Sequence, residues 1–252
     1  FMTDVDAARS LPGADIPWLQ ERRASGLSRF DALGVPTPKL ESWKYPRLRP
    51  LDDTQYVPVS DADGQVEVSQ IPGIGNALAR LVFVNGRLRE DLSDLSELPN
   101  GVRFGSIDTA LNADADWVQE QLGKVAGDAD EAMVSLNEAM LDSGFVLHVP
   151  KGVVLTRPLE VVYIGGLTDR AVAYFPRNLI VIDEGAQATL VKHHDGRGVG
   201  GYFANAVTEV TVSAGAFFKH YKVQAESIYA THVTTLYADV ARDATYESFA
   251  LS

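Results

Sequence analysis

The sequence predicts a mainly β protein that begins with a helical domain over residues 1–144 and continues with short strands over residues 145–252. Three observations support this prediction. β-Branched runs punctuated by Gly and Pro begin at residue 145, and no amphipathic helix interrupts them afterwards. Turn-then-strand units also recur about every thirty residues, a period typical of a solenoid or β-helix. The residues themselves leave two folds open: the first coils of a right-handed parallel β-helix, and a β-sandwich.

The N-terminal part is predicted to hold three helices. The first is expected to begin after Asp15, which can cap it, and to end at Gly34. The prolines of residues 34–51 predict an extended or turning segment. Apolar spacing then predicts two helices, one with Trp117, Val118, Leu122 and Val125 and the other with Met133, Leu136, Met140 and Leu141 before Gly144.

Strands are predicted on both sides of these helices. Asn85-Gly86 predicts a tight hairpin between strands 79–84 and 87–88, because both central residues of a type I′ turn take positive φ. The strands of the β part are expected at 177–182, 186–193, 205–213, 216–225, 231–241 and 244–251.

Composition excludes several classes of protein. A formal net charge of −12 argues against a general binder of nucleic acid or anionic membranes. The chain has no cysteine, which excludes disulfides, thiolate catalysis and cysteine-bound zinc or iron–sulfur sites within it. No apolar run is long enough to span a bilayer. The opening FMTDVDAARS does not resemble a signal peptide, so a cytoplasmic location is expected.

Histidines are the candidate metal ligands, because neutral imidazoles bind transition metals. His193 and His194 lie near the end of a predicted strand, and His220 lies one unit later. Adjacent residues on a strand point to opposite faces, so His193 and His194 cannot easily share one metal ion. These three are therefore weak candidates, and no tight metal site is expected. His148 and His232 stand alone in strands and are expected to be core or surface residues.

No catalytic or cofactor-binding residue is predicted. The glycine-rich residues 195–201 lead into a strand rather than into the Lys-Ser/Thr pair and helix of a phosphate loop, so they predict a turn between coils. Acidic residues suggest an alternative function, a β-helix enzyme that acts on polysaccharide with a metal, although their spacing shows no recognisable pair. They are Asp183, Glu184, Glu209, Glu226, Asp239 and Glu247.

Four stretches occur in the order and style of the SufB/SufD family, and nearly all of the chain resembles that family, most closely its SufD members. They are ESWKYPRLRPL (41–51), LVFVNGRLREDLS (81–93), LNEAMLDSGFVLHVPKGVVLTRPLEVVYI (136–164) and PRNLIVIDEGAQATLVKHH (176–194). The resemblance implies an N-terminal helical domain, a right-handed parallel β-helix and a C-terminal helical domain. Only the first two correspond to this sequence.

The resemblance implies a non-catalytic scaffold subunit of the SUF iron–sulfur cluster assembly complex, with SufB and the ATPase SufC as partners. It implies that this chain binds no cofactor and that the cluster forms at the level of the complex. Relatives continue past ESFALS (247–252) into coils and helices that include the SufC-binding segment, so no cluster ligand is assigned here. A SufB-like role is disfavoured by the absence of cysteine. A homodimer through the β-helix edge is expected if the molecule ends at Ser252.

Overall fold

The computed structural model describes residues 11–44, 48, 51, 53–59, 71–127, 131–166, 168–197 and 200–252. The α-helices of this part of the chain are α1 (Pro17–Leu33), α3 (Ile107–Gln121) and α4 (Ala132–Met140). Short 3-10 helices, η2 (Glu41–Trp43) and η4 (Glu90–Leu92), lie between them. Among the described residues, no helix has both the length and the apolar character needed to cross a membrane.

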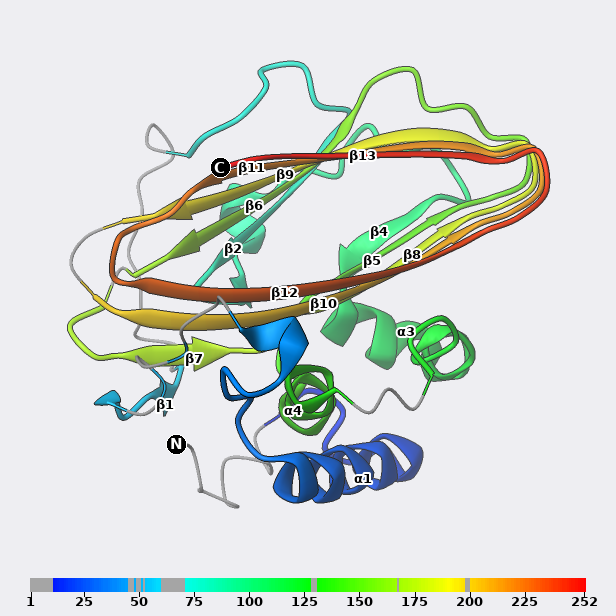
Figure 1. The fold of residues 1–252 in the computed structure, drawn as a ribbon. Coiled ribbons are helices and arrows are strands. Elements are labelled where there is room, and N and C mark those ends of the chain that lie inside the picture. Colours follow the sequence, from blue (N-terminus) through cyan, green and yellow to red (C-terminus); the bar gives the residue numbers. More distant parts are fainter. Residues whose placement is uncertain are drawn as a thin grey trace.

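The strands form two sheets that face each other as the walls of a parallel β-solenoid (Figure 1). The helix-facing sheet has the order β1 (Val57–Pro58), β7 (Val172–Tyr174), β10 (Tyr202–Val212), β8 (Arg177–Ile182), β5 (Phe145–Val149) and β4 (Arg103–Ser106), with β12 (Ala230–Val240) also paired to β10. The opposite sheet has the order β13 (Thr245–Leu251), β11 (Phe217–Ala225), β9 (Gln187–Gly196), β6 (Leu159–Gly165), β2 (Ala79–Val84) and β3 (Arg87–Leu88).

The strand register confirms the solenoid. Leu159, Leu190, His220 and Ser248 occupy one position in successive coils. Their spacing matches the period of about thirty residues that the sequence predicts. Strands of successive coils pair in parallel, whereas a β-sandwich is built from antiparallel pairs, so the sandwich alternative is wrong. Between the named strands, antiparallel pairs occur at β2–β3 and β4–β5, and an isolated antiparallel bridge joins Arg80 and Asp94.

Side-chain alternation along the strands gives the solenoid a packed interior and a helix-facing exterior. Inward-facing apolar side chains of both sheets, including Phe83, Phe145, Leu159 and Phe218, form one buried cluster. The outer face of the helix-facing sheet is also covered by side chains. α3 packs there on Val146 and Leu179, and α4 packs on Ala173, Phe175 and Phe203. Figure 1 shows α4 between this sheet and α1.

A buried ion pair ties the helical segment to the solenoid. Arg177 Nη2 on β8 lies 2.5 Å from Glu209 Oε1 on β10, and both side chains are almost fully buried. Glu209 also accepts hydrogen bonds from the backbone N–H groups of Gly123, Val125 and Ala126, at 2.8 to 3.0 Å. These groups belong to the turn that follows α3. Glu209 therefore holds the chain between α3 and α4 against the sheet.

Electrostatics keeps this carboxylate charged. Burial alone would raise the pKa of Glu209, but Arg177 and the N–H groups of Ala126 and Gly123 hold that pKa below its usual value. Asn137 on α4 extends the network, because its amide accepts from Arg177 Nη1 and donates to the backbone oxygens of Pro176 and Asn205. α4 is thereby fixed to the same two strands.

Most of the expected elements form where the sequence predicts them. The hairpin at Asn85-Gly86 is confirmed, with φ of 47° and 80° at the two residues. It also joins the solenoid wall, because β2 pairs in parallel with β6. The six later strands begin and end within a few residues of their expected limits. The domain boundary between residues 144 and 145 stays a prediction.

The helix ends differ more from expectation. Asp15 does not cap α1. Ile16 is the N-cap residue, and its side chain makes no capping hydrogen bond. Pro17 is the first residue of the helix, a position where a backbone N–H would have no acceptor within the helix, so proline is tolerated there. The predicted stop is confirmed, because Gly34 N–H donates to the carbonyl of Phe30. The expected turning segment at residues 34–51 contains the short η2 helix and lies partly outside the described residues.

We predict that Glu209→Gln destabilises the protein by about 3–5 kcal/mol, because it leaves the Arg177 guanidinium buried without its counter-charge. The free energy of unfolding in urea measures this. Glu247→Gln is the matched control, since Glu247 pairs with Lys219 across 3.6 Å at the partly exposed surface. The control should change stability by less than about 1 kcal/mol. Equal effects of the two substitutions would contradict the anchoring role of Glu209.

Candidate functional site

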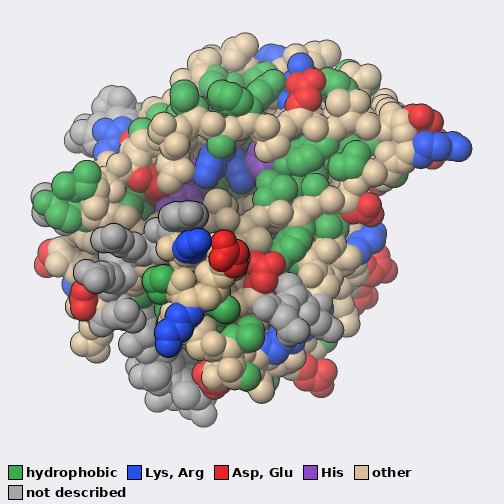
Figure 2. Space-filling model, viewed as in Figure 1, with side chains coloured by type: hydrophobic (Ala, Val, Ile, Leu, Met, Phe, Trp, Pro, Cys, Tyr) green, Lys and Arg blue, Asp and Glu red, His purple; other side chains and the backbone are tan. Residues whose placement is uncertain are grey.

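The solenoid interior changes from apolar to polar along its strands. On β11, Phe218 is followed on the same face by His220, Lys222 and Gln224. On β9, buried Leu190 is followed by buried Lys192 and His194. Figure 2 shows histidine and Lys or Arg side chains gathered between the two sheets, bordered by hydrophobic side chains. This polar interior is the candidate functional site.

Two lysines lie side by side in this interior, since Lys192 and Lys222 occupy the same position in neighbouring coils. Lys192 is only 5% exposed. Burial, and next the charge of Lys222, lower the pKa of Lys192 to about 7. Burial also lowers the pKa of Lys222. Lys192 can therefore gain or lose a proton near neutral pH, which an exposed lysine cannot.

The buried histidines are held neutral. Burial, with the neighbouring charges of His232 and the two lysines, holds the pKa of His194 well below its usual value. Its ring stacks on Tyr163 at 5.1 Å between centroids. His220 is buried too, and its pKa is lowered in the same way. Its Nδ1 lies 3.0 Å from the hydroxyl of Tyr246.

A carboxylate completes the cluster where the chain turns from β11 to β12. Glu226 Oε2 lies 2.7 Å from His232 Nδ1, and Glu226 Oε1 accepts a hydrogen bond of 2.9 Å from the Tyr202 hydroxyl. Burial alone would raise the pKa of Glu226, but the hydrogen bond with His232, the charge of that histidine and the hydrogen bond from Tyr202 lower it below its usual value. The His194 and His232 rings are 4.7 Å apart. Two imidazoles and one ionised carboxylate thus meet inside the solenoid.

The structure separates the two adjacent histidines, as strand alternation predicts. His193 points to the outside of β9, where its Nε2 lies 3.0 Å from Glu160 Oε1, whereas His194 points inward. His148 lies on β5, where its Nε2 is 2.8 Å from Asp183 Oδ2. The wider expectation from the sequence, that the histidines form no tight metal site, is not tested by this separation.

Sequence reasoning missed His232 and Glu226 as neighbours of His194. The signal that could have found them is the coil period, because it places Gln224 next to His194 across the β9–β11 pair. The turn that begins at Glu226, and the first residues of β12 after it, then lie close to His194. The prediction that His232 stands alone in a strand did not take into account that this turn brings His232 back to His194.

Three of the other candidate acidic residues pair with basic side chains outside this cluster. Glu184 pairs with Lys151, Glu209 with Arg177 and Glu247 with Lys219. Asp239 is exposed on β12. The glycine-rich stretch 195–201 lies partly outside the described residues. Strand β10 begins at Tyr202, so a strand follows this stretch rather than the helix of a phosphate loop.

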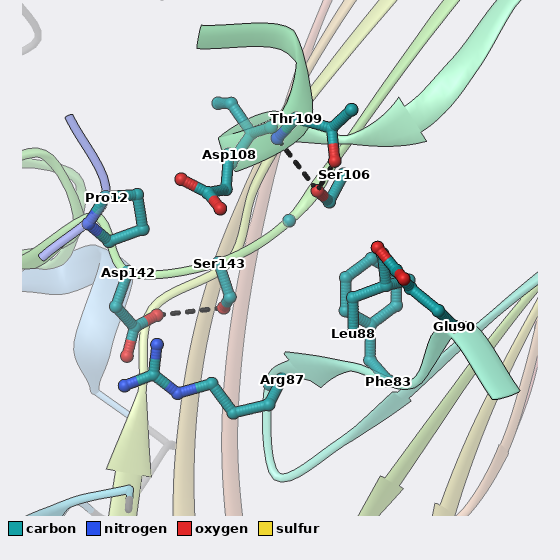
Figure 3. A pocket seen from close by; sticks show the side chains of 13 residues that line it. Pro12, Phe83, Arg87, Leu88, Glu90, Ser106, Asp108, Thr109, Asp142 and Ser143 are labelled. Carbon is teal, nitrogen blue, oxygen red and sulfur yellow. Dashed lines mark hydrogen bonds between the residues drawn. The ribbon is translucent and has the colours of Figure 1, made fainter. Parts of the chain in front are cut away.

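A surface pocket of about 280 Å³ lies away from the interior cluster, between the β2–β3 hairpin, the start of α3 and the turn after α4 (Figure 3). Glu90, Asp108 and Asp142 make it acidic, and Arg87 lies beside Asp142. Burial raises the pKa of Asp142 to about 6, although the Phe175 N–H and the Ser143 hydroxyl donate to it. Those hydrogen bonds tie Asp142 to the turn after α4 and to the solenoid, which is a structural role.

The fold is that of a protein built around a parallel β-solenoid with helices along one wall, and comparison with protein families agrees. The model described as SufBD protein N-terminal region matches residues 6–161. The model described as SUF system FeS cluster assembly, SufBD core domain, matches residues 165–252. The chain therefore belongs to the SufBD family of the SUF iron–sulfur cluster assembly system, and the resemblance found in the sequence is confirmed.

Individual relatives are distant. The chain is 28% identical to the iron-sulfur cluster assembly protein SufD of Escherichia coli over 84% of this chain and 48% of that protein. It is 22% identical to the SufBD family protein slr0076 of Synechocystis over 88% of this chain and 51% of the relative. It is 29% identical to SufB of Bacillus subtilis over 54% of this chain and 28% of that protein. The chain spans about half the length of the first two.

We predict that Lys192→Met stabilises the protein near neutral pH and that this gain shrinks as the pH rises. Below about pH 7 the folded state must keep a charged lysine in its interior, whereas the unfolded state has that lysine in water. Between about pH 7 and about pH 10.5 the unfolded state binds more protons, so the stability of the natural protein rises with pH. Each unit of pKa shift corresponds to about 1.4 kcal/mol.

Urea unfolding of both proteins at about pH 6 and about pH 10 measures the difference. Lys219→Met is the control, because Lys219 is on the outer face of β11 and is partly exposed. If the free energies of unfolding of Lys192→Met and the natural protein differ by the same amount at both pH values, the pKa of Lys192 is not lowered in the folded state.

Proposed function

We propose that this chain is a SufD-like scaffold subunit of the SUF system, which acts in the cytoplasm and catalyses no reaction itself. Family membership supports the assembly role over the polysaccharide-active alternative. The observation that carries the SufD-like choice is the absence of cysteine in a chain of this family. Because protein iron–sulfur clusters are held chiefly by cysteine thiolates, a cluster bound at these residues needs ligands from outside them.

The partners proposed for this subunit are SufB and SufC homologues. SufC supplies ATP hydrolysis in this proposal, which suits a chain whose sequence has no phosphate-loop motif. SufB supplies the cysteine ligands. The solenoid then serves as a rigid wall that positions its partners, because repeated backbone pairing between coils resists bending. A SufB-like role is the competing assignment, supported by the partial match to a SufB protein.

Co-purification of the tagged full-length protein from its source cells tests this proposal. We expect a SufC homologue and a second, cysteine-containing SufBD protein to be recovered with it. An unrelated tagged protein of similar charge serves as the control. Recovery of neither partner, under conditions that preserve such complexes, would contradict the scaffold role. Recovery of SufC with a cysteine-free SufBD partner would support the SufB-like assignment instead.

A further inference from the structure

Among the described residues, an imidazole of the interior cluster has a buried ring nitrogen without a hydrogen-bond partner. His232 has a side chain only 4% exposed, and its Nε2 has no partner although its Nδ1 faces Glu226. His194 is 8% exposed, and its ring contacts Tyr163 and His232 instead of hydrogen-bonding to a described residue. Buried polar atoms without partners are rare in native proteins and point to a bound water or ion.

The chemistry of the three side chains favours a metal ion over a water. Imidazole nitrogens and a carboxylate oxygen are ligands for divalent first-row transition metals. Imidazole binds a metal in its neutral form, and burial keeps His194 in that form. The carboxylate of Glu226 supplies the negative charge. Further contacts hold this carboxylate in place, since it accepts from Tyr202 and from the Gln224 side chain.

We propose that His194, Glu226 and His232 form a binding site for one divalent first-row transition-metal ion. Each residue offers one ligand atom, and these atoms lie within 4.8 Å of one another. A tetrahedral site with bonds of about 2.0–2.1 Å places its ligands about 3.3 Å apart, so modest side-chain rotations bring the ligand atoms to bonding distance. This proposal replaces the prediction from the sequence that the histidines form no tight metal site. It rests on the side chains alone and does not depend on the SufD-like role.

The bound ion would link different coils of the solenoid. His194 lies near the end of β9, Glu226 follows β11 and His232 lies near the start of β12, so one ion joins both sheets at the turn between them. Lys192 and Lys222 lie in the same interior and oppose a cation. The charge of Glu226 must offset them, so metal affinity should depend strongly on that charge.

Titration of Zn²⁺ into the metal-free full chain by calorimetry tests the proposal. We expect one ion per chain with micromolar or tighter affinity, together with a Zn²⁺-dependent rise in Tm. His194→Phe, His232→Gln and Glu226→Gln should each weaken binding by more than about tenfold and abolish the rise in Tm. His194→Phe keeps an aromatic ring on Tyr163, and Glu226→Gln keeps the shape of the side chain while removing its charge.

The matched control is His193→Phe, which changes the neighbouring histidine on the outer face of β9. It should leave Zn²⁺ affinity unchanged. The absence of saturable Zn²⁺ binding by the natural chain would overturn the proposal, whether or not every variant folds. Binding that survives in all three site variants, or that is lost in His193→Phe, would also overturn it, because the ion would then lie elsewhere.

Discussion

The ion pair between Arg177 and Glu209 is the interaction on which the arrangement of this protein depends. A carboxylate buried on the outer face of a sheet is unfavourable unless charge and hydrogen bonds surround it. Here a guanidinium and three backbone N–H groups do so, and those N–H groups come from the turn after α3. The requirement to satisfy one charge therefore sets where the helical segment meets the solenoid.

The interior of the solenoid shows the opposite situation. Backbone hydrogen bonds between coils form whatever the inward side chains are, so a stretch of interior can carry polar groups without loss of the fold. Lys192, His194 and His220 occupy positions where the first coils have Val161, Tyr163 and Leu159. Each polar group lowers stability unless it finds a partner. Local departures from the apolar pattern are expected at functional positions, and the unpartnered Nε2 of His232 lies among them.

Membership of the SufBD family and the lack of cysteine constrain function together. The family places the chain in the SUF assembly system. A chain without thiolates offers imidazole, carboxylate and amine groups to any bound species. The polar interior gathers these three kinds of group, whereas the acidic surface pocket beside α3 is built from residues that already tie the turn after α4 in place.

The sequence by itself determined the repeat, the strands and the hairpin, because β-branched runs, turn residues and the positive φ required at Asn85-Gly86 are local properties. It did not determine the start of α1, where Pro17 at the first turn took precedence over a cap by Asp15. Only the tertiary structure decided that Glu226 and His232 meet His194, or that Glu209 meets the turn after α3. Such contacts join residues that are distant in the chain, and coil stacking and one buried charge bring them together.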